Sequence, residues 1–438
     1  MNQLLCGAAE RVITPSLGVK IPGYFRVRVS DGVKTDLKAH AIVLNDGDTR
    51  LAIIHLDIIC FQASLAKAIR KRLWEQLQIP ADCVMLAATH THTGGASNYR
   101  DLCTPKLPKD ELERLIEKTV AAVADANRRA VPVTMHYAFG EEKTIAFNRN
   151  YWMTDGSIVT NPGKRRPFEV VRPVSPIDHT LGVIRFDTLD GTPVAQLVNF
   201  ACHPDTVGGT AFCADYPGEL CSLQQEHFGA DFVTVYLNGA SGNVNHLNAE
   251  WYKTPGFALD RSTHYHYMGE VLSRAVCGLH GQLEQADDVT LDAISKTYRT
   301  ARRQPNDADM QWVADVYADP KAATADDLIY ARELTLLHKH PKRYATVEIQ
   351  AFRIGPCAVA TLPCEAYADI ALSIRKESPF EHLMITSLTN GYLGYVVTEP
   401  AFSAGVYESK LSLTNSFLPP KAADEMAECA VKLLHTLQ

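Results

Sequence analysis

The sequence has no apolar run long enough to cross a membrane, no block of like charge longer than residues 164–166, and no Cys-x-x-Cys pair. A membrane span requires about 18 consecutive apolar residues, so no membrane anchor is expected. The missing basic block, with a net charge of −7 and a pI near 6.1, argues against a nucleic-acid-binding protein. The eleven cysteines are scattered singly, which favours free thiols in a reducing compartment over a disulfide framework.

The first six residues lack both a basic segment and an apolar stretch, so no secretory signal is expected. Together with the cysteine usage, this predicts a cytoplasmic location. The 438 residues, 46% hydrophobic and 21% charged, are typical of a globular protein with a large core. The expected partner is a small-molecule substrate, and assembly as a homo-oligomer is left open.

Short apolar runs alternate with helical patterns, which predicts an α/β fold with mixed β-sheets flanked by helices. Residues 1–438 are interpreted as one catalytic domain, with a charged, Ala-rich helical insertion at about 305–345. The predicted strands are residues 41–44, 51–60, 83–88, 133–139, 181–186, 195–201, 232–237, 346–354 and 358–362. The predicted helices are residues 65–78, 110–129, 265–283 and 422–437.

Metal-seeking side chains stand where apolar runs end, and strand ends are where α/β proteins gather reactive groups. His90 and His92 follow a predicted strand, and on an extended segment both rings point to one face. One ring could bind a metal while the other acts on substrate; hydrogen-bonded structural histidines are the alternative. His203 follows another strand and precedes Pro204, which ends it.

Three further sites have both a structural and a functional interpretation. Asp215 could orient a ligating imidazole or cap a helix that begins after Pro217. Glu365 either opens a predicted helix, where the helix dipole would favour its charge, or ligates a metal. Residues 238–245, with Gly242, Asn243 and Asn245, form either a tight polar loop or a cradle of backbone N–H groups for an oxyanion.

Two other His-x-His pairs, His264 with His266 and His338 with His340, lie within helical patterns. Residues two apart on a helix do not share a face. No metal binding is expected at either pair.

Together these fragments resemble the catalytic domain of the neutral/alkaline non-lysosomal ceramidases, a family of zinc-dependent amidases. The resemblance runs from residues 12–15 and 22–24 to Tyr407-Glu408. It rests on the Thr-His-Thr-His-Thr-Gly segment at 89–94, on Cys-His-Pro at 202–204 with Ala-Asp-x-x-Gly at 214–218, on Pro-Cys-Glu at 363–365, and on Asn-x-Tyr-x-x-Tyr-Val-x-Thr at 390–398.

Carried over to this sequence, the resemblance implies a zinc ion with four protein ligands. Three other residues would contact the substrate or transition state. The implied ligands are His90, His203, Glu365 and Tyr395, and the implied catalytic residues are His92, Arg149 and Tyr407.

The sequence departs from the family where the family has its nucleophilic serine, a position that aligns with Asn245. An amide cannot attack a carbonyl, and Ser241 lies four residues earlier. The chain also ends without the family's C-terminal immunoglobulin-like domain. These departures indicate a divergent member whose substrate is small, polar and soluble.

The predicted activity is hydrolysis of an amide or ester bond, in an N-acyl compound or sugar derivative, by zinc-activated water. His92, Asp215 and Asp57 remain alternatives for the general base, and Arg149, Tyr407 or Asn245 for the oxyanion contact. A zinc-dependent lyase or isomerase acting on a sugar-like substrate is a second hypothesis, and a non-catalytic binding protein a third.

Overall fold

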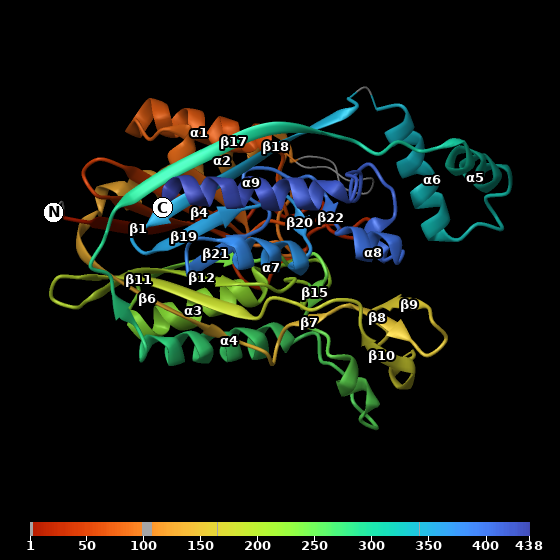
Figure 1. The fold of residues 1–438 in the computed structure, drawn as a ribbon, viewed down its shortest axis with the longest axis horizontal. Helices are drawn as coiled ribbons and strands as arrows, with labels where there is room; N and C mark the ends of the chain where they lie inside the picture. Colours follow the sequence, from red (N-terminus) through yellow and green to blue (C-terminus); the bar gives the residue numbers. More distant parts are fainter. Residues whose placement is uncertain (1–2, 99–106, 164, 341) are drawn as a thin grey trace.

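Two β-sheets packed face to face, with helices on their outer surfaces, make up most of the molecule (Figure 1). The computed structural model describes residues 3–98, 107–163, 165–340 and 342–438. The larger sheet contains, in spatial order, β14 (Val233–Asn238), β12 (Pro193–Phe200), β11 (Thr180–Thr188), β6 (Val131–Glu141), β1 (Leu5–Val12), β3 (Lys38–Asn45), β4 (Arg50–Leu56) and β5 (Val84–Ala88), with β16 (Glu284–Gln285) beside β6. The smaller sheet contains β17 (Leu291–Ala301), β18 (Tyr344–Ile354), β19 (Cys357–Thr361) and β21 (His382–Thr386).

The remaining elements are short strand pairs and helices. The short strands are β10 (Val170–Pro173), β8 (Asn150–Met153) and β9 (Ile158–Thr160), β13 (Ala211–Phe212) with β2 (Gly32–Val33), β15 (Val244–Asn245) with β7 (Phe147–Asn148), and β20 (Glu365–Ala366) with β22 (Tyr395–Val396). The helices are α1 (Ala63–Leu77), α2 (Lys109–Arg128), α3 (Asp215–Phe228), α4 (His264–His280), α5 (Asp307–Ala318), α6 (Ala325–His338), α7 (Ala368–Glu377), α8 (Glu399–Ser403) and α9 (Lys421–Leu437).

The central strands are apolar on both faces because each face is covered. Leu51 and Ile53 of β4 point into the core between the sheets, while Ala52 and Ile54 point to the opposite core, which helices α1 and α2 cover. Successive side chains of a strand alternate between faces. A strand buried on both faces therefore has a continuous apolar sequence. This apolar run is what predicted strand β4.

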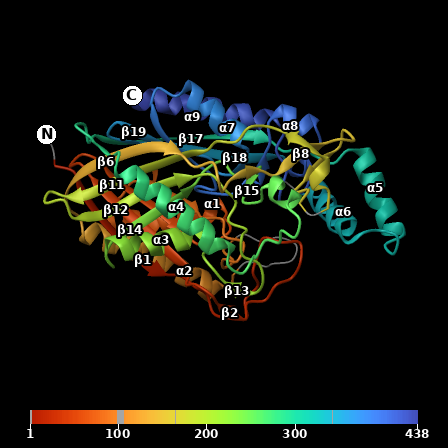
Figure 2. The same ribbon diagram turned by 90° about the horizontal axis from the view of Figure 1, so that it is seen from below.

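Helices close the outer surface of each sheet. Helices α2 and α4 pack on the larger sheet, and α9 packs on β17 and β18 of the smaller one (Figure 2). Helices α5 and α6 extend beyond the sheets at one end of the molecule (Figure 1). The predicted mixed α/β architecture is therefore confirmed, and the insertion is helical as expected.

Among the strands of five or more residues, three were not predicted, each for a physical reason. Strand β1 is rich in Ala and Gly, and its Gly7 lies so close to helix α2 that an added Cβ would fall 2.0 Å from the carbonyl oxygen of Ala126. Strand β17 lies at the edge of its sheet and is largely exposed, so it lacks an apolar pattern. Strand β21, His-Leu-Met-Ile-Thr, has only three apolar residues in a row, fewer than β5 and β19, which are equally long.

Two predicted helix starts were wrong. Helix α3 begins at Asp215 rather than after Pro217. Glu365 does not open a helix: it lies in β20, paired in parallel with β22, and helix α7 begins three residues later, at Ala368. Glu365 therefore does not lie at the N-terminus of a helix, where a helix dipole would favour its charge. The structural interpretation of this carboxylate is wrong.

Candidate active site

Three pairs of parallel strands end at the same place in the molecule. The pairs are β4 with β5, β12 with β14, and β19 with β21. Backbone hydrogen bonds join their ends: the N–H of Ala88 donates to the carbonyl of Leu388, and the N–H of Ser387 donates to that of Asn238. The loops after these strands therefore converge on one crevice, as expected at the carboxyl ends of parallel strands.

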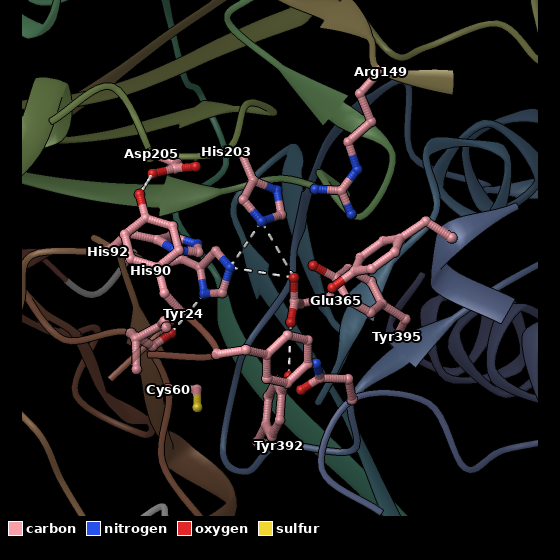
Figure 3. Close-up of a pocket in the computed structure, with 15 residues that line it drawn as sticks. Tyr24, Cys60, His90, His92, Arg149, His203, Asp205, Glu365, Tyr392 and Tyr395 are labelled. Atoms are coloured by element: carbon pink, nitrogen blue, oxygen red, sulfur yellow. Dashed lines mark hydrogen bonds and ion pairs between the residues drawn. The ribbon is translucent and has the colours of Figure 1, made fainter. Parts of the chain in front are cut away.

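Three metal-binding atoms meet in that crevice (Figure 3). The Nε2 atoms of His90 and His203 lie 3.1 Å apart. Each lies 3.3 Å from Oε2 of Glu365. All three side chains are buried. The sequence therefore correctly predicted that these residues, which are separated by up to 275 positions, come together.

The outer ring nitrogens fix which nitrogen of each histidine bears the proton. Nδ1 of His90 lies 2.7 Å from the carbonyl oxygen of Ile59, and Nδ1 of His203 lies 2.9 Å from that of Ser241. A carbonyl oxygen only accepts, so Nδ1 must be the protonated nitrogen of the neutral ring. Each Nε2 then presents a lone pair, the arrangement of a metal-ligating histidine held by its other nitrogen.

The spacing of the three atoms fits a zinc ion. Tetrahedral zinc with ligands at about 2.0–2.1 Å has its ligand atoms roughly 3.3 Å apart, which matches the three separations in the crevice. Among the described residues, Oε2 of Glu365 is buried and has no hydrogen-bond donor. Two lone pairs and a carboxylate oxygen at this distance repel one another unless a cation lies between them.

The carboxylate is held in one orientation by a hydrogen bond to its other oxygen. The hydroxyl of Tyr392 donates a 2.7 Å hydrogen bond to Oε1. This bond orients the carboxylate so that Oε2 faces His90 and His203, as partners behind a metal ligand commonly do.

His92 lies beside the three donors. Its ring centre is 4.9 Å from that of His90 and 5.5 Å from that of His203, and the three imidazoles together could hold a metal. Among the described residues, neither ring nitrogen of His92 has a hydrogen-bond partner. Burial, and then His90, lower its pKa well below the usual value, so the ring is neutral.

The route by which His92 reaches the site differs from the predicted one. The 89–93 segment is not extended, because His90 has a φ of 72°, in the left-handed region. The chain turns after β5, and this turn brings both rings to one pocket. The predicted convergence is correct, but its predicted geometry is wrong.

Tyr395 lies on the strand beside Glu365, since the two residues are register partners in β20 and β22. Burial raises the pKa of Tyr395 well above its usual value, so its hydroxyl is an uncharged donor atom. Either Tyr395 or His92 could complete a set of four ligands. Figure 3 shows both side chains turned toward the crevice.

Arg149 enters the pocket from the side opposite Tyr392 (Figure 3). Its Nε donates to Glu408 at 2.5 Å, and its guanidinium lies 5.2 Å from the ring centre of Tyr395. Glu408 also accepts from Asn150 and Tyr367, and its side chain is fully buried. Nη2 of Arg149 is buried without a partner among the described residues, which leaves a cationic donor for a ligand.

The pocket around these groups has a volume of about 210 Å³. Tyr407, one of the predicted catalytic residues, lies at its mouth, with 40% of its surface exposed. Residues that line the pocket but that the sequence did not single out for the site are Phe25, Ile59, Cys60, Tyr392, Asp205 and Asn415, together with Gly23 and Tyr24. Of these, Gly23, Tyr24 and Tyr392 lie in segments that already carried the family resemblance.

The predicted substrate-binding residues do not line this pocket. The side-chain oxygen of Asn243 accepts from the N–H of Ala368, and the side-chain amide of Asn245 donates to Asn161. These bonds stabilise the loop itself, so the interpretation as a tight polar loop is the better one. The loop still serves the site, because its Ser241 carbonyl fixes His203.

Gly242 acts through its lack of a side chain. Its N–H donates to the carbonyl of Ala366, and an added Cβ would lie 2.6 Å from the carbonyl oxygen of Glu365. The loop after β14 thus packs directly on the backbone that carries the ligating carboxylate. Only glycine permits this approach.

Asp215 does not orient the imidazole of His203, and it serves the start of α3 only from within the helix, by accepting from the N–H of Tyr216. Nδ1 of His203 faces Ser241 instead. The carboxylate of Asp215 accepts from the backbone N–H groups of Thr206 and Val207 and from the Thr206 hydroxyl, so it braces the loop that follows His203. Burial raises its pKa to about 6. Asp57 is likewise bound to backbone and lies outside the pocket lining.

A second buried cluster contains His40, His55 and Cys221. Nδ1 of His55 accepts from the N–H of Tyr236, so its proton is on Nε2. The other His-x-His pairs form no such cluster within the described residues. Ten cysteines in the described part of the chain are free thiols.

Comparison with known proteins supports the same picture. Residues 5–213 match the family model described as "Neutral/alkaline non-lysosomal ceramidase, N-terminal". Neutral ceramidase A of Dictyostelium discoideum is 22% identical over 250 residues, which cover 53% of this chain and 33% of the relative, so the alignment spans about a third of that protein's length.

Two solved ceramidase structures align with the whole chain. The neutral ceramidase from Pseudomonas aeruginosa has a TM-score of 0.76 at 18% identity, and a ceramidase complexed with C2 has a TM-score of 0.76 at 15% identity. Each alignment covers 100% of this chain and 75% of the solved one. At these identities the two structures show the fold.

The fold and the converging donors define an α/β protein with a pocket at its strand ends whose side chains could hold a metal ion. The predicted resemblance is confirmed: residues 5–213 match the family model of the neutral/alkaline non-lysosomal ceramidases, and the chain shares its fold with solved ceramidases. Within the described residues, no helix combines the length and apolarity needed to span a bilayer.

Proposed function

We propose that this chain is a zinc-dependent hydrolase that cleaves the amide bond, or an ester bond, of a small polar N-acyl compound. The observation that carries the proposal is the convergence of two Nε2 lone pairs and one carboxylate oxygen within 3.3 Å of one another. The names of the similar proteins, which are ceramidases, support amide hydrolysis as the reaction class.

His90, His203 and Glu365 would hold the zinc ion, with Tyr395 or His92 as a further ligand. Bound zinc supplies a Lewis acid that polarises a carbonyl group and activates a water molecule for attack. The protein's own part is to keep the donors fixed. The carbonyls of Ile59 and Ser241 and the hydroxyl of Tyr392 do this through the hydrogen bonds described above.

His92 is the best placed general base when Tyr395 is the fourth ligand. Its ring is neutral, so a lone pair is available at neutral pH to take a proton from the attacking water. The same ring would then return that proton to the leaving amine. Asp57 and Asp215 are both bound to backbone N–H groups and lie outside the pocket lining, which leaves His92 in this role.

Arg149 would stabilise the charge that develops on the carbonyl oxygen. Its buried Nη2 has no partner among the described residues, and Glu408 fixes the guanidinium from behind. A donor of this kind contributes roughly 3–4 kcal/mol to transition-state stabilisation. Because Asn245 stands where the family has its serine and is bound to Asn161, the attack is by water.

The test compares zinc-loaded and chelator-treated protein on a panel of N-acetyl and N-hexanoyl amines and amino sugars, with the matching esters. Release of amine or alcohol is measured, and zinc is counted by elemental analysis. We expect amide cleavage only by the zinc-loaded form and none by Glu365→Gln. Zinc-loaded protein that cleaves no amide or ester, or activity that survives chelation, would contradict the proposal.

A further inference from the structure

The helical insertion reaches the mouth of the pocket through one aromatic side chain, that of Tyr330 in α6. The Tyr330 ring packs edge-on against the ring of Phe25, with centroids 5.9 Å apart. Its hydroxyl lies close enough to that of Tyr407 for each to shift the pKa of the other. Phe25 and Tyr407 both line the pocket, so Tyr330 stands directly behind two of its rim residues.

Tyr330 is held in place from its other side as well. Nζ of Lys410 lies 3.5 Å from the centre of the Tyr330 ring, a close cation–π contact. The residue is only 5% exposed. An aromatic ring fixed by three neighbours forms a rigid wall.

Helix α6 is fastened to the loop that forms the same side of the pocket. Glu333, which is fully buried, accepts from both the N–H and the hydroxyl of Thr414. The next residue, Asn415, lines the pocket, and its carbonyl accepts from the N–H of Tyr395. The insertion is thus part of the pocket's support.

The insertion keeps its own shape through a separate small core and well-formed helix ends. Val313 and Val316 of α5 pack against Ala331 and Leu334 of α6. Both helices begin with a capping box. Leu334 belongs to this core rather than to the rim, so it offers a matched control position on the same helix.

We propose that Tyr330 sets the length of the acyl group that the pocket accepts, by closing the space behind Phe25 and Tyr407. This inference rests on the proposed hydrolase function. With the wall in place, a short acyl group ends at the rim, whereas a longer one must displace an aromatic ring. The insertion therefore selects short-chain substrates, in contrast to the long-chain lipid expected of a ceramidase.

The experiment measures kcat/KM for N-acetyl and N-octanoyl amides of the same amine in wild type, Tyr330→Ala and Tyr330→Phe, all with zinc bound. We expect wild type to prefer the acetyl amide and Tyr330→Ala to raise the octanoyl-to-acetyl ratio about tenfold, the lower end of what a few methylenes are worth in an apolar pocket. Tyr330→Phe keeps the ring and should keep the wild-type ratio. Leu334→Ala loosens the insertion without opening the rim, and should also keep it.

Binding of acetate, butyrate and octanoate, measured by calorimetry, gives a second readout that needs no turnover. Tyr330→Ala should gain octanoate affinity relative to acetate. If wild type binds the carboxylates with the expected preference but cleaves no amide, the hydrolase proposal fails alone. The proposed role of Tyr330 is overturned if folded, zinc-loaded Tyr330→Ala keeps the wild-type preference for acyl length, or if Leu334→Ala changes that preference equally. It is also overturned if wild type binds acetate, butyrate and octanoate with equal affinity, or binds none of them.

Discussion

Two buried clusters of histidines stand on the same set of strands, yet only one is arranged to bind a metal. In the first, the outer nitrogens of His90 and His203 face carbonyl oxygens, so their lone pairs point inward toward Glu365. In the second, the Nδ1 lone pair of His55 is already used by the backbone N–H of Tyr236.

The difference lies in what surrounds the rings rather than in the rings themselves. Burial raises the pKa of Cys221 well above its usual value, so the third member of the second cluster keeps its proton. His55 and Cys221 therefore present protons, whereas His90 and His203 of the first cluster present lone pairs. The number of histidines therefore does not identify a metal site. What identifies it is a hydrogen-bond acceptor on the outer nitrogen of each ring, which leaves the inner nitrogen with a lone pair.

The sharpest test of this comparison removes one histidine from each cluster. His203→Ala should abolish both zinc retention and hydrolysis, because a ligand is lost. His55→Asn should keep the wild-type zinc content, at a cost of about 1–3 kcal/mol in unfolding free energy if the Tyr236 N–H loses its acceptor. Zinc per chain is measured after dialysis. Equal zinc loss in the two variants would show that both clusters bind metal.

Acid should act on the second cluster without any metal. Burial lowers the pKa of His40 to about 4, from 6.5 in the unfolded chain. The unfolded state therefore binds the proton more strongly, and stability that is fully present above pH 6.5 is lost as the pH falls toward 4. One such residue accounts for roughly 3 kcal/mol. Urea unfolding of the zinc-free protein at pH 7, 5.5 and 4 should show a flatter dependence in His40→Gln, and an unchanged slope would refute this assignment.

The smallest effect expected concerns the support of the first cluster. Tyr392→Phe removes the hydroxyl that orients Glu365 and should weaken zinc binding by about 10–100-fold, as loss of such partners does. Competition with a chelator measures the affinity. Tyr367→Phe is the control, since its hydroxyl bonds Glu408 instead. Equal affinities in wild type and Tyr392→Phe would remove Tyr392 from the metal centre.

The sequence located the ligands well because side-chain identity at strand ends is visible in it. His90, His203 and Glu365 were found from the runs that precede them and from the family motifs. The carbonyls of Ile59 and Ser241 could not be found, because every residue has a carbonyl and only the fold decides where it points. The same reason explains why Asp215 was misjudged: its partners are backbone N–H groups.

The fold was predictable where strands are buried on both faces, as in β4 and β5, and unpredictable where packing replaces pattern. Strand β1 is the clearest case, because its Ala and Gly residues serve the close approach of α2. The role of Gly242 belongs to the same class. A glycine in a polar loop is typical of a turn, and nothing in the sequence shows that the backbone of Glu365 lies against it.

The three donors come from positions 90, 203 and 365, and the strand that positions the last of them pairs with residues 395–396. A chain leaving the ribosome therefore lacks the strand that positions its third donor until residue 396 has been made. If the site holds zinc as proposed, the ion can be captured only after that point, and a fragment that stops short of β22 would lack the strand that fixes its third donor.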